Sequence, residues 1–220
     1  MYNCHYRSVR TAIKITRANM SNLYLARHGE STYNRDNRFT GWIDAPLTEK
    51  GRLEAHAIAE KLEGCSFEKA YISKLIRARD SLNIVLSAIH RFDIPVIESE
   101  ALNERHYGDL QGLNKAETAQ RFGEERVRMW RRSYSVAPPN GESLRDTAAR
   151  VLPFFNTCIM NDVSNGRNVL VLAHGNSLRS IVMDIDRLSE EEILKVTIVT
   201  GEVIHYEFAA DMAVLLKEVL

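Results

Sequence analysis

The sequence is poor in cysteine and has no long hydrophobic run. Its 220 residues include three cysteines, Cys4, Cys65 and Cys158. They are too few and too widely spaced for a disulfide framework or a zinc-binding pattern. No apolar stretch approaches the roughly 18 residues that a membrane-spanning helix needs. We therefore expect no disulfide scaffold and no membrane partner, and we expect a reducing, cytoplasmic location.

The sequence also lacks an excess of charge of either sign. Its 29 Lys and Arg residues balance 29 Asp and Glu residues, so the formal net charge is +0. Proteins that bind nucleic acids usually carry a basic excess or a basic face, so the balance argues against a nucleic-acid partner. The chain has 45% hydrophobic and 26% charged residues, a composition typical of globular proteins. Its length suits one α/β domain with a sizeable core.

Acidic residues are absent from residues 1–19, which carry four basic ones. This composition is typical of an amphipathic targeting segment. The alternative is an upstream start codon, because Met20 would lead directly into the first expected strand. We favour the second interpretation. We expect residues 1–19 to be an N-terminal extension that is disordered or a start-site artefact, followed by a single catalytic domain over 20–220.

Two apolar runs end in a His-Gly pair. Residues 22–32 read NLYLARHGEST, and residues 168–177 read NVLVLAHGNS. In each, a buried strand is expected to end just before the histidine, His28 or His174, and the small polar residues that follow suit the first turn of a helix. Open α/β sheets bind ligands at the carboxyl ends of their strands. The two histidines would therefore share one pocket if their strands are neighbours.

The neighbours of His28 indicate which chemistry such a pocket would perform. A single histidine at a strand end is more often structural, but here the motif is repeated and Arg27 precedes the first copy. Neutral imidazole is a nucleophile near pH 7, and arginine binds phosphate through paired, charge-assisted hydrogen bonds. Arg77, in the first turn of an expected helix, is a second candidate for phosphate binding. These residue types together favour phosphoryl transfer onto a histidine.

Strand and helix patterns alternate along the rest of the chain. Further strands are expected over 67–73, 95–97 and 167–173, helices over 49–62, 76–89, 115–122, 124–132, 142–160 and 178–185, and a closing hairpin over 203–208 and 212–216. Helical spacing on the first helix predicts a buried face made of Leu53, Ala57, Ile58 and Leu62. Pro153 is expected to kink the helix over 142–160. The alternation predicts a three-layer α/β/α sandwich with a mostly parallel sheet and an antiparallel edge.

A polar segment over 101–118, ALNERHYGDLQGLNKAET, carries further reactive side chains. Glu104 is the carboxylate that we expect near the phosphate site. Two adjacent arginines, Arg131 and Arg132, follow at the end of the helix expected over 124–132. Adjacent side chains project about 100° apart on a helix, so both reach one ligand only if the helix ends there.

These motifs resemble the cofactor-dependent phosphoglycerate mutases of the histidine phosphatase superfamily. RHGES at 27–31 is similar to the superfamily signature, and HG at 174–175 to its second histidine. More specific to the mutases are RFTGW at 38–42, the segment 102–118, WRR at 130–132 and HGNSLR at 174–179. The similarity extends from about Leu23 to Val219. The chain departs from longer members in a short link after Pro139 and in its end at Leu220, where many members continue into a mobile tail.

The resemblance implies interconversion of 3-phosphoglycerate and 2-phosphoglycerate in glycolysis and gluconeogenesis. It implies that 2,3-bisphosphoglycerate primes a phosphohistidine, that no metal takes part, and that the partners are small phosphoglycerates. We expect a homo-oligomer, a dimer rather than a monomer. Without the longer members' tail, we also expect some loss of phosphate from the phosphoenzyme to water.

The resemblance also implies a role for each site residue. His28 would be the nucleophile, Glu104 the proton donor and acceptor, and His174 a group that stabilises the transferring phosphoryl group. Arg27, Arg77 and a protonated His174 could supply the charge that other transferases take from a metal. The ligand-binding residues would be Arg27, Arg77 and Asn34 at the transferring phosphoryl group, and Thr40, Gly41, Tyr107, Lys115, Arg131, Arg132, Gly175 and Asn176 at the substrate carboxylate and second phosphate.

Two alternatives stay open at this point. In a phosphatase of the same superfamily, water would discharge the phosphohistidine. The segments 102–118 and 130–132 argue against it, because a promiscuous phosphatase needs few groups at the distal end of its substrate. A catalytically silent module that binds phospho-ligands is the other. The presence of all three reactive residues, His28, Glu104 and His174, argues against that alternative.

Overall fold

The computed structural model describes residues 20–220, and the interpretation of residues 1–19 lies outside them. A six-stranded sheet runs through the protein in the order β3-β2-β4-β1-β5-β6. The strands are β1 (Ser21–Arg27), β2 (Lys69–Ile72), β3 (Val96–Glu98), β4 (Val169–Ala173), β5 (Val203–Phe208) and β6 (Val214–Val219). The four strands from β3 to β1 are parallel, whereas β5 is antiparallel to both of its neighbours. The expected mostly parallel sheet with an antiparallel edge is confirmed.

The central strands β1 and β4 are apolar on both faces because helices cover both sides of the sheet. Leu23 and Leu25 of β1 belong to the core on one face, and Tyr24 and Ala26 to the core on the other. The parallel pairing aligns Arg27 with Ala173. The residues that follow the two strands therefore leave the sheet side by side.

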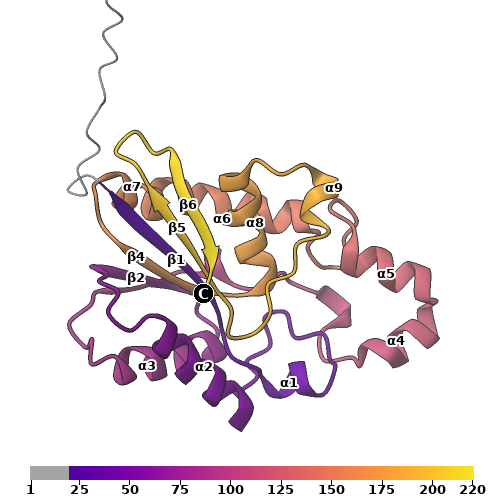
Figure 1. Ribbon diagram of the computed structural model, residues 1–220. Helices are drawn as coiled ribbons and strands as arrows, with labels where there is room; N and C mark the ends of the chain where they lie inside the picture. The colour runs from indigo at the N-terminus through magenta and orange to yellow at the C-terminus, as the bar shows by residue number, and fades with distance from the viewer. Residues whose placement is uncertain (1–19) are drawn as a thin grey trace, which may run out of the picture.

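Two helical layers enclose the sheet (Figure 1). Apolar residues of α2 (Glu49–Lys61) and α3 (Ile76–Ala88) pack on one face. Residues of α6 (Leu144–Phe154), α7 (Met160–Ser164) and α8 (Gly175–Asp186) pack on the other. The three-layer α/β/α architecture is therefore as expected. None of the helices in residues 20–220 is both long and apolar enough to span a membrane.

The buried face of α2 differs from the face that the sequence predicts. Leu53 is 61% exposed, so its expected burial is wrong. The residues that face the core are Ala55, Ile58, Ala59 and Leu62, at the i, i+3, i+4, i+7 spacing of a helical stripe. Two of them are alanines, whose small side chains let α2 lie close to its neighbours. The predicted burial of Ile58 and Leu62 is confirmed, whereas Leu53 and Ala57 lie to the side of the stripe that faces the core.

The helix expected over 142–160 is interrupted after Pro153. The helix α6 begins after Ser143, whose side chain accepts a hydrogen bond from the amide of Asp146, and it ends at Phe154. A π-helical turn follows over Phe155–Ile159 and leads into α7. Proline has no amide hydrogen to donate and its ring crowds the preceding turn, which accounts for the wider turn at this point.

A helical hairpin stands to one side of the sheet in Figure 1. Its helices, α4 (Lys115–Phe122) and α5 (Glu124–Arg132), have the predicted bounds. They enclose a third apolar cluster, separate from the two sheet cores, made of Phe39, Leu110, Val127 and Trp130. This small core fixes the first residue of α4 and the last residues of α5 against the loops beside the sheet.

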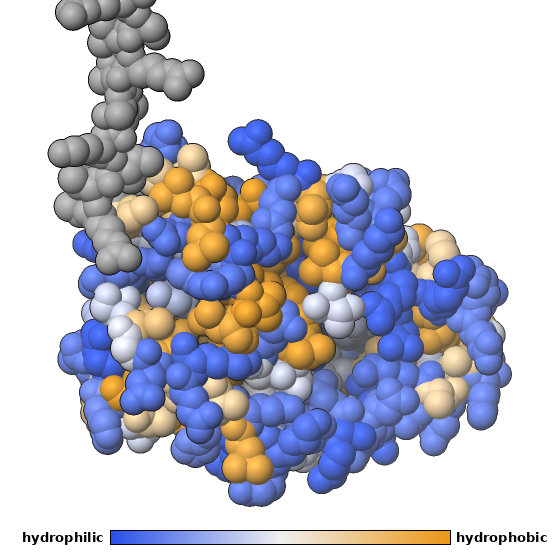
Figure 2. Space-filling view, in the orientation of Figure 1, coloured by the Kyte–Doolittle hydropathy of each residue, from blue (hydrophilic) through white to orange (hydrophobic). Residues whose placement is uncertain are grey.

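The edge strand β6 leaves apolar side chains on the surface. Figure 2 shows apolar surface on the face that carries β5 and β6. The exposed apolar residues of β6 are Val214, Leu215, Leu216 and Val219. Lys217 and Glu218 interrupt this strip, and charged side chains of this kind discourage edge-to-edge aggregation.

Candidate active site

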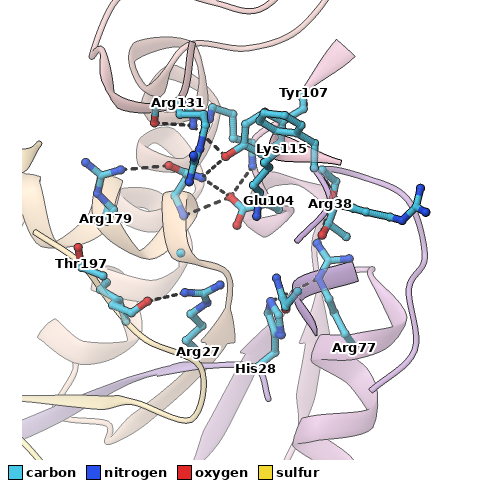
Figure 3. Close-up of a pocket in the computed structure, with 18 of the residues that line it drawn as sticks. Arg27, His28, Arg38, Arg77, Glu104, Tyr107, Lys115, Arg131, Arg179 and Thr197 are labelled. Carbon is cyan, nitrogen blue, oxygen red and sulfur yellow. Dashed lines mark hydrogen bonds between the residues drawn. The ribbon is translucent and has the colours of Figure 1, made fainter. Parts of the chain in front are cut away.

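A pocket opens beyond the carboxyl ends of β1 and β4 (Figure 3). The segments that line it come from five regions: the end of β1 with the loop after it, the start of α3, the loop before α4 with the α4–α5 hairpin, the start of α8, and the segment 196–198 before β5. The predicted site residues that line it are Arg27, His28, Asn34, Thr40, Gly41, Arg77, Glu104, Tyr107, Lys115, Arg131, Arg132, Gly175 and Asn176. His174 lies behind His28, with the two ring centroids 4.8 Å apart.

Hydrogen bonds fix the tautomer of His28. Its Nδ1 lies 2.6 Å from the carbonyl oxygen of Gly29, and Arg77 Nε donates to its Nε2 at 3.3 Å. A carbonyl only accepts and a guanidinium only donates, so Nδ1 carries the hydrogen and Nε2 presents its lone pair. Burial, followed by the charges of Arg77 and Arg27, lowers the pKa of His28 well below its ordinary value. The ring is therefore neutral and nucleophilic near pH 7.

His174 is fully buried and its Nε2 lies 2.6 Å from Ser73 Oγ. Its Nδ1 has no hydrogen-bond partner among residues 20–220. Burial, followed by the charges of Arg77 and His28, lowers the pKa of His174 well below its ordinary value. These surroundings favour a neutral His174 and do not support the expectation of a protonated one.

Arg77 is buried in the first turn of α3, where the chain has just left β2. It donates to the carbonyl oxygens of Gly41 at 2.8 Å and Ile43 at 3.1 Å, in addition to His28. Burial is the main cause that lowers its pKa to about 10. These contacts hold a guanidinium beside Nε2 of His28, the ring nitrogen that carries no hydrogen, where an incoming phosphoryl group would need it.

Gly41 reaches this position through a backbone conformation that other residues rarely adopt. Its φ is +53°, and an added Cβ would lie 2.1 Å from Gln111 Oε1. Its carbonyl can therefore face Arg77 while its other side packs closely on the 101–118 segment.

Asn34 is anchored at the edge of the pocket, because its Oδ1 accepts hydrogen bonds from the amide and hydroxyl of Ser31.

Glu104 is 8% exposed and uses its two carboxylate oxygens differently. Oε1 accepts from the Arg105 amide at 2.7 Å, the Asn176 amide at 3.1 Å and Asn176 Nδ2 at 2.9 Å. Oε2 makes no hydrogen bond within residues 20–220. The backbone is fixed as well, because Trp42 Nε1 donates to the Glu104 carbonyl at 2.6 Å. One oxygen anchors the group and the other is free to accept or deliver a proton.

The α4–α5 hairpin brings basic residues to the far end of the pocket. Lys115 is the first residue of α4, and Arg131 and Arg132 are the last two of α5. The helix does end at Arg132, which is the condition for both arginines to reach one ligand. Burial, followed by the charges of Arg131 and Arg27, lowers the pKa of Lys115 to about 8. The pocket is therefore strongly cationic even before a ligand enters.

The charge of the lining is very different from that of the whole chain. Eight lining residues are basic, namely Arg27, Arg38, Arg77, Arg105, Lys115, Arg131, Arg132 and Arg179. Glu104 is the one acidic residue that lines the pocket within the described part of the chain. Such a site is suited to a small ligand that carries several negative charges.

Sequence reasoning missed three of these arginines, Arg38, Arg105 and Arg179. Arg105 directly follows Glu104, is 1% exposed, and donates to Tyr107 Oη at 2.9 Å. Arg179 lies one turn after Asn176 on α8 and is 6% exposed. All three arginines lie within the motifs quoted from the sequence, and that position was the signal available. Without such a motif, an arginine is more often a solvated surface residue.

Comparison with known proteins agrees with this geometry. The family profile of the histidine phosphatase superfamily (branch 1) matches residues 23–218. The 2,3-bisphosphoglycerate-dependent phosphoglycerate mutase 2 of Gloeobacter violaceus is 54% identical over 192 residues, which cover 87% of this chain and 88% of that protein. The 2,3-bisphosphoglycerate-dependent phosphoglycerate mutase of Parvibaculum lavamentivorans is 50% identical over 200 residues, with 90% and 95% covered.

A solved structure shares the architecture at lower identity. The mycobacterial glucosyl-3-phosphoglycerate phosphatase superposes with a TM-score of 0.75 at 28% identity, covering 84% of this chain and 92% of its own. The sheet and its flanking helices are thus common to proteins named as mutases and as phosphatases, whereas the higher identity lies with the mutases. The chain therefore belongs to branch 1 of the histidine phosphatase superfamily and, within it, to the family of 2,3-bisphosphoglycerate-dependent phosphoglycerate mutases.

Proposed function

We propose that this protein interconverts 3-phosphoglycerate and 2-phosphoglycerate, with His28 phosphorylated by 2,3-bisphosphoglycerate. The observation that carries the proposal is the arrangement of charge along the pocket. A neutral histidine with Arg77 lies at one end, Lys115 and Arg131 lie at the other, and Glu104 lies between them. A bisphosphoglycerate has two phosphates and a carboxylate, so it needs cations at both ends. Relatives at about half identity carry the same activity in their names.

In the first step, His28 Nε2 attacks the phosphorus atom of a bound phosphate ester. The bond from phosphorus to the glycerate oxygen breaks, and that oxygen takes a proton from the Glu104 carboxyl group. Nδ1 of His28 keeps its hydrogen bond to Gly29, which stabilises the ring as it gains positive character. The guanidinium groups of Arg27 and Arg77 stabilise the charge spread over the phosphoryl oxygens.

In the second step, a hydroxyl group of the bound phosphoglycerate attacks the phosphorus on His28. Glu104 accepts the hydroxyl proton through Oε2, to which no group of residues 20–220 donates, while Oε1 keeps the carboxylate in place. Whether the phosphate ends on carbon 2 or carbon 3 depends on how the glycerate is oriented. Tyr107, Lys115 and Arg131, which line the distal end, are the groups that would hold either orientation.

We propose that the protein's own cations perform the electrostatic role that a metal ion has in other phosphoryl transferases. Arg27 and Arg77 flank His28, and both bear a positive charge at neutral pH. A role in the interconversion of glycolytic intermediates also implies that the protein acts in the cytoplasm.

One assay tests the proposal against the phosphatase alternative. The protein is incubated with 3-phosphoglycerate, with and without 2,3-bisphosphoglycerate, and both 2-phosphoglycerate and free phosphate are measured. We expect 2-phosphoglycerate to form quickly, to depend on the bisphosphate, and to exceed free phosphate. Free phosphate as the main product would establish a phosphatase, and neither product would establish a binding module.

A further inference from the structure

We propose that Arg179 is a positioning residue for the proton transfer. It fixes the orientation of the Asn176 side-chain amide and, through that amide, the carboxylate of Glu104. The inference rests on the proposed function, in which Glu104 exchanges a proton with the substrate hydroxyl.

Arg179 is held rigidly on α8, one helical turn after Asn176. Its Nη1 donates to Asn176 Oδ1 at 3.2 Å, and its Nη2 donates to the carbonyl oxygen of Ile193 at 2.6 Å. Ile193 is the last residue of the short helix α9 (Glu190–Ile193). Only 6% of Arg179 is exposed, so contacts on two sides keep the guanidinium from turning away.

The chemistry of arginine decides which way the Asn176 amide faces. A guanidinium has donors and no acceptor, so the Asn176 atom in front of it must be the oxygen. The nitrogen Nδ2 then faces Glu104 Oε1 at 2.9 Å and Tyr107 Oη at 3.5 Å. A flipped amide would place Nδ2 against the guanidinium and Oδ1 against the carboxylate, and both contacts would be repulsive. Arg179 therefore selects one of two otherwise similar amide orientations.

The selected orientation controls how Glu104 presents its free oxygen. Oε1 has three donors, one of which is the Asn176 side chain. Losing that donor, or replacing it with an oxygen, would loosen the carboxylate and turn Oε2 away from the ligand. Misplacement of a catalytic group by a small distance is enough to cost a large factor in rate.

The charge of Arg179 gives independent support for a functional role. It forms no ion pair with a carboxylate in the described part of the chain, although it is almost fully buried. Its Nε has no hydrogen-bond partner there either. A buried charge without a direct counter-ion is costly to keep. An apolar residue would fill the same volume at a lower cost in folding free energy. What Arg179 provides and an apolar residue would not is its two donated hydrogen bonds.

Two phosphate donors separate this role from a general structural one. Phosphorylation of His28 by 2,3-bisphosphoglycerate releases an alkoxide that needs a proton from Glu104. Phosphorylation by p-nitrophenyl phosphate releases a phenolate that leaves without one. In Arg179→Met we expect the maximal rate with the bisphosphate to fall roughly ten- to a hundredfold. The rate with the nitrophenyl ester should fall much less than the rate with the bisphosphate, and Glu104→Gln should show the same selectivity between the two donors.

A double substitution tests whether Arg179 acts through Asn176. Asn176→Ala alone should give the same selective loss, and adding Arg179→Met to it should cause no further loss. Arg91→Met is a control outside the pocket lining, since Arg91 is part-buried and donates to the carbonyl oxygen of Phe67 and to Asp93. It should leave both rates unchanged. If Arg179→Met does not fold, Arg179→Lys and Asn176→Ala allow the same comparison.

Three results would overturn the inference: equal losses with both donors, unchanged rates in Arg179→Met, or additive losses in the double variant. A wild-type protein that 2,3-bisphosphoglycerate fails to phosphorylate would instead contradict the proposed function itself. The two failures are distinguishable because the second is seen before any residue is changed.

Discussion

The imidazole rings of His28 and His174 lie 4.8 Å apart and are tilted by 58°. They come from distant parts of the chain, and the parallel pairing of β1 with β4 brings them together. Each ring has a different surrounding: Nε2 of His28 faces the pocket, whereas Nε2 of His174 contacts Ser73. One repeated motif thus places one histidine at the pocket and another beside Ser73, outside the pocket lining.

Replacing His28 should abolish turnover while the fold is kept. We expect His28→Ala to lose roughly a thousandfold or more in kcat, because the covalent route disappears. In the wild type, brief treatment with 2,3-bisphosphoglycerate should add one acid-labile phosphate to His28, detectable by mass spectrometry. His56→Ala, on the exposed side of α2, is the control and should behave as wild type. Phosphate on a serine, or near-normal turnover of His28→Ala, would contradict the mechanism.

Substitution of the arginines at the end of α5 should impair recognition of the substrate's distal end. A hydrogen bond to a charged group contributes about 1.5–3 kcal/mol, so Arg131→Ala or Arg132→Ala should lower kcat/KM for 3-phosphoglycerate roughly ten- to a hundredfold. Phosphorylation of His28 by p-nitrophenyl phosphate should change much less. Arg128→Ala is a control on the same helix, where Arg128 pairs with Glu125 in solvent. Equal losses with both donors would show that the pair supports the fold instead.

Substrate affinity should fall as the pH rises through the pKa of Lys115. Burial and the nearby cations lower that pKa to about 8, so the ammonium group loses its proton above this pH and attracts anions less. The phosphate of the substrate has its second pKa near 6, so its charge is constant in this range. We expect KM for 3-phosphoglycerate to rise above about pH 8. In Lys115→Arg, which stays protonated, the rise should be smaller, and an identical rise would refute this assignment.

The turn after β1 should tolerate no side chain at Gly29. A Cβ there would lie 2.0 Å from the carbonyl oxygen of Gly51, so one backbone segment would have to move. We expect Gly29→Ala to lower the free energy of unfolding by about 1–3 kcal/mol in a urea titration. Gly175→Ala is the comparison, since its nearest neighbour would be Arg27 at an ordinary 3.5 Å. Similar stability of the two variants would show that the turn can adjust.

Catalysis should persist after treatment with a chelator, because Arg27 and Arg77 supply positive charge beside His28. We expect the rate of 2-phosphoglycerate formation in EDTA to equal the untreated rate. Complete loss, with recovery on adding manganese or magnesium, would indicate a metal-dependent mutase reaction.

Much of the fold could be predicted because local signals agree with the final packing. The bounds of α4 and α5 were predictable from their periodicity and from Gly123 between them. The burial of Leu53 was predicted wrongly because residue type alone does not say which face of α2 meets the sheet. The π-helical turn after Pro153 was not predicted, because a kink prediction gives the place of the interruption but not the form of the turn that follows.

The site could be predicted as a set of residues but less well as a network. The motifs named the residues around His28 and Glu104, and all of them lie in or directly behind the pocket. Their roles stay predictions until they are measured. Arg179 was missed because its importance depends on Ile193 and Asn176 converging on it in space. The sequence shows the i, i+3 spacing of Asn176 and Arg179, but it does not show that the Ile193 carbonyl group meets the same guanidinium.

The small apolar cluster of Phe39, Leu110, Val127 and Trp130 has a consequence for how this protein could diverge. It stabilises the α4–α5 hairpin without drawing on either core of the sheet. The reacting histidine and the distal cations therefore depend on different sets of packing contacts. Mutations can alter which phosphate ester is accepted while the machinery that takes up its phosphate stays intact, so new specificities can arise on this scaffold one region at a time.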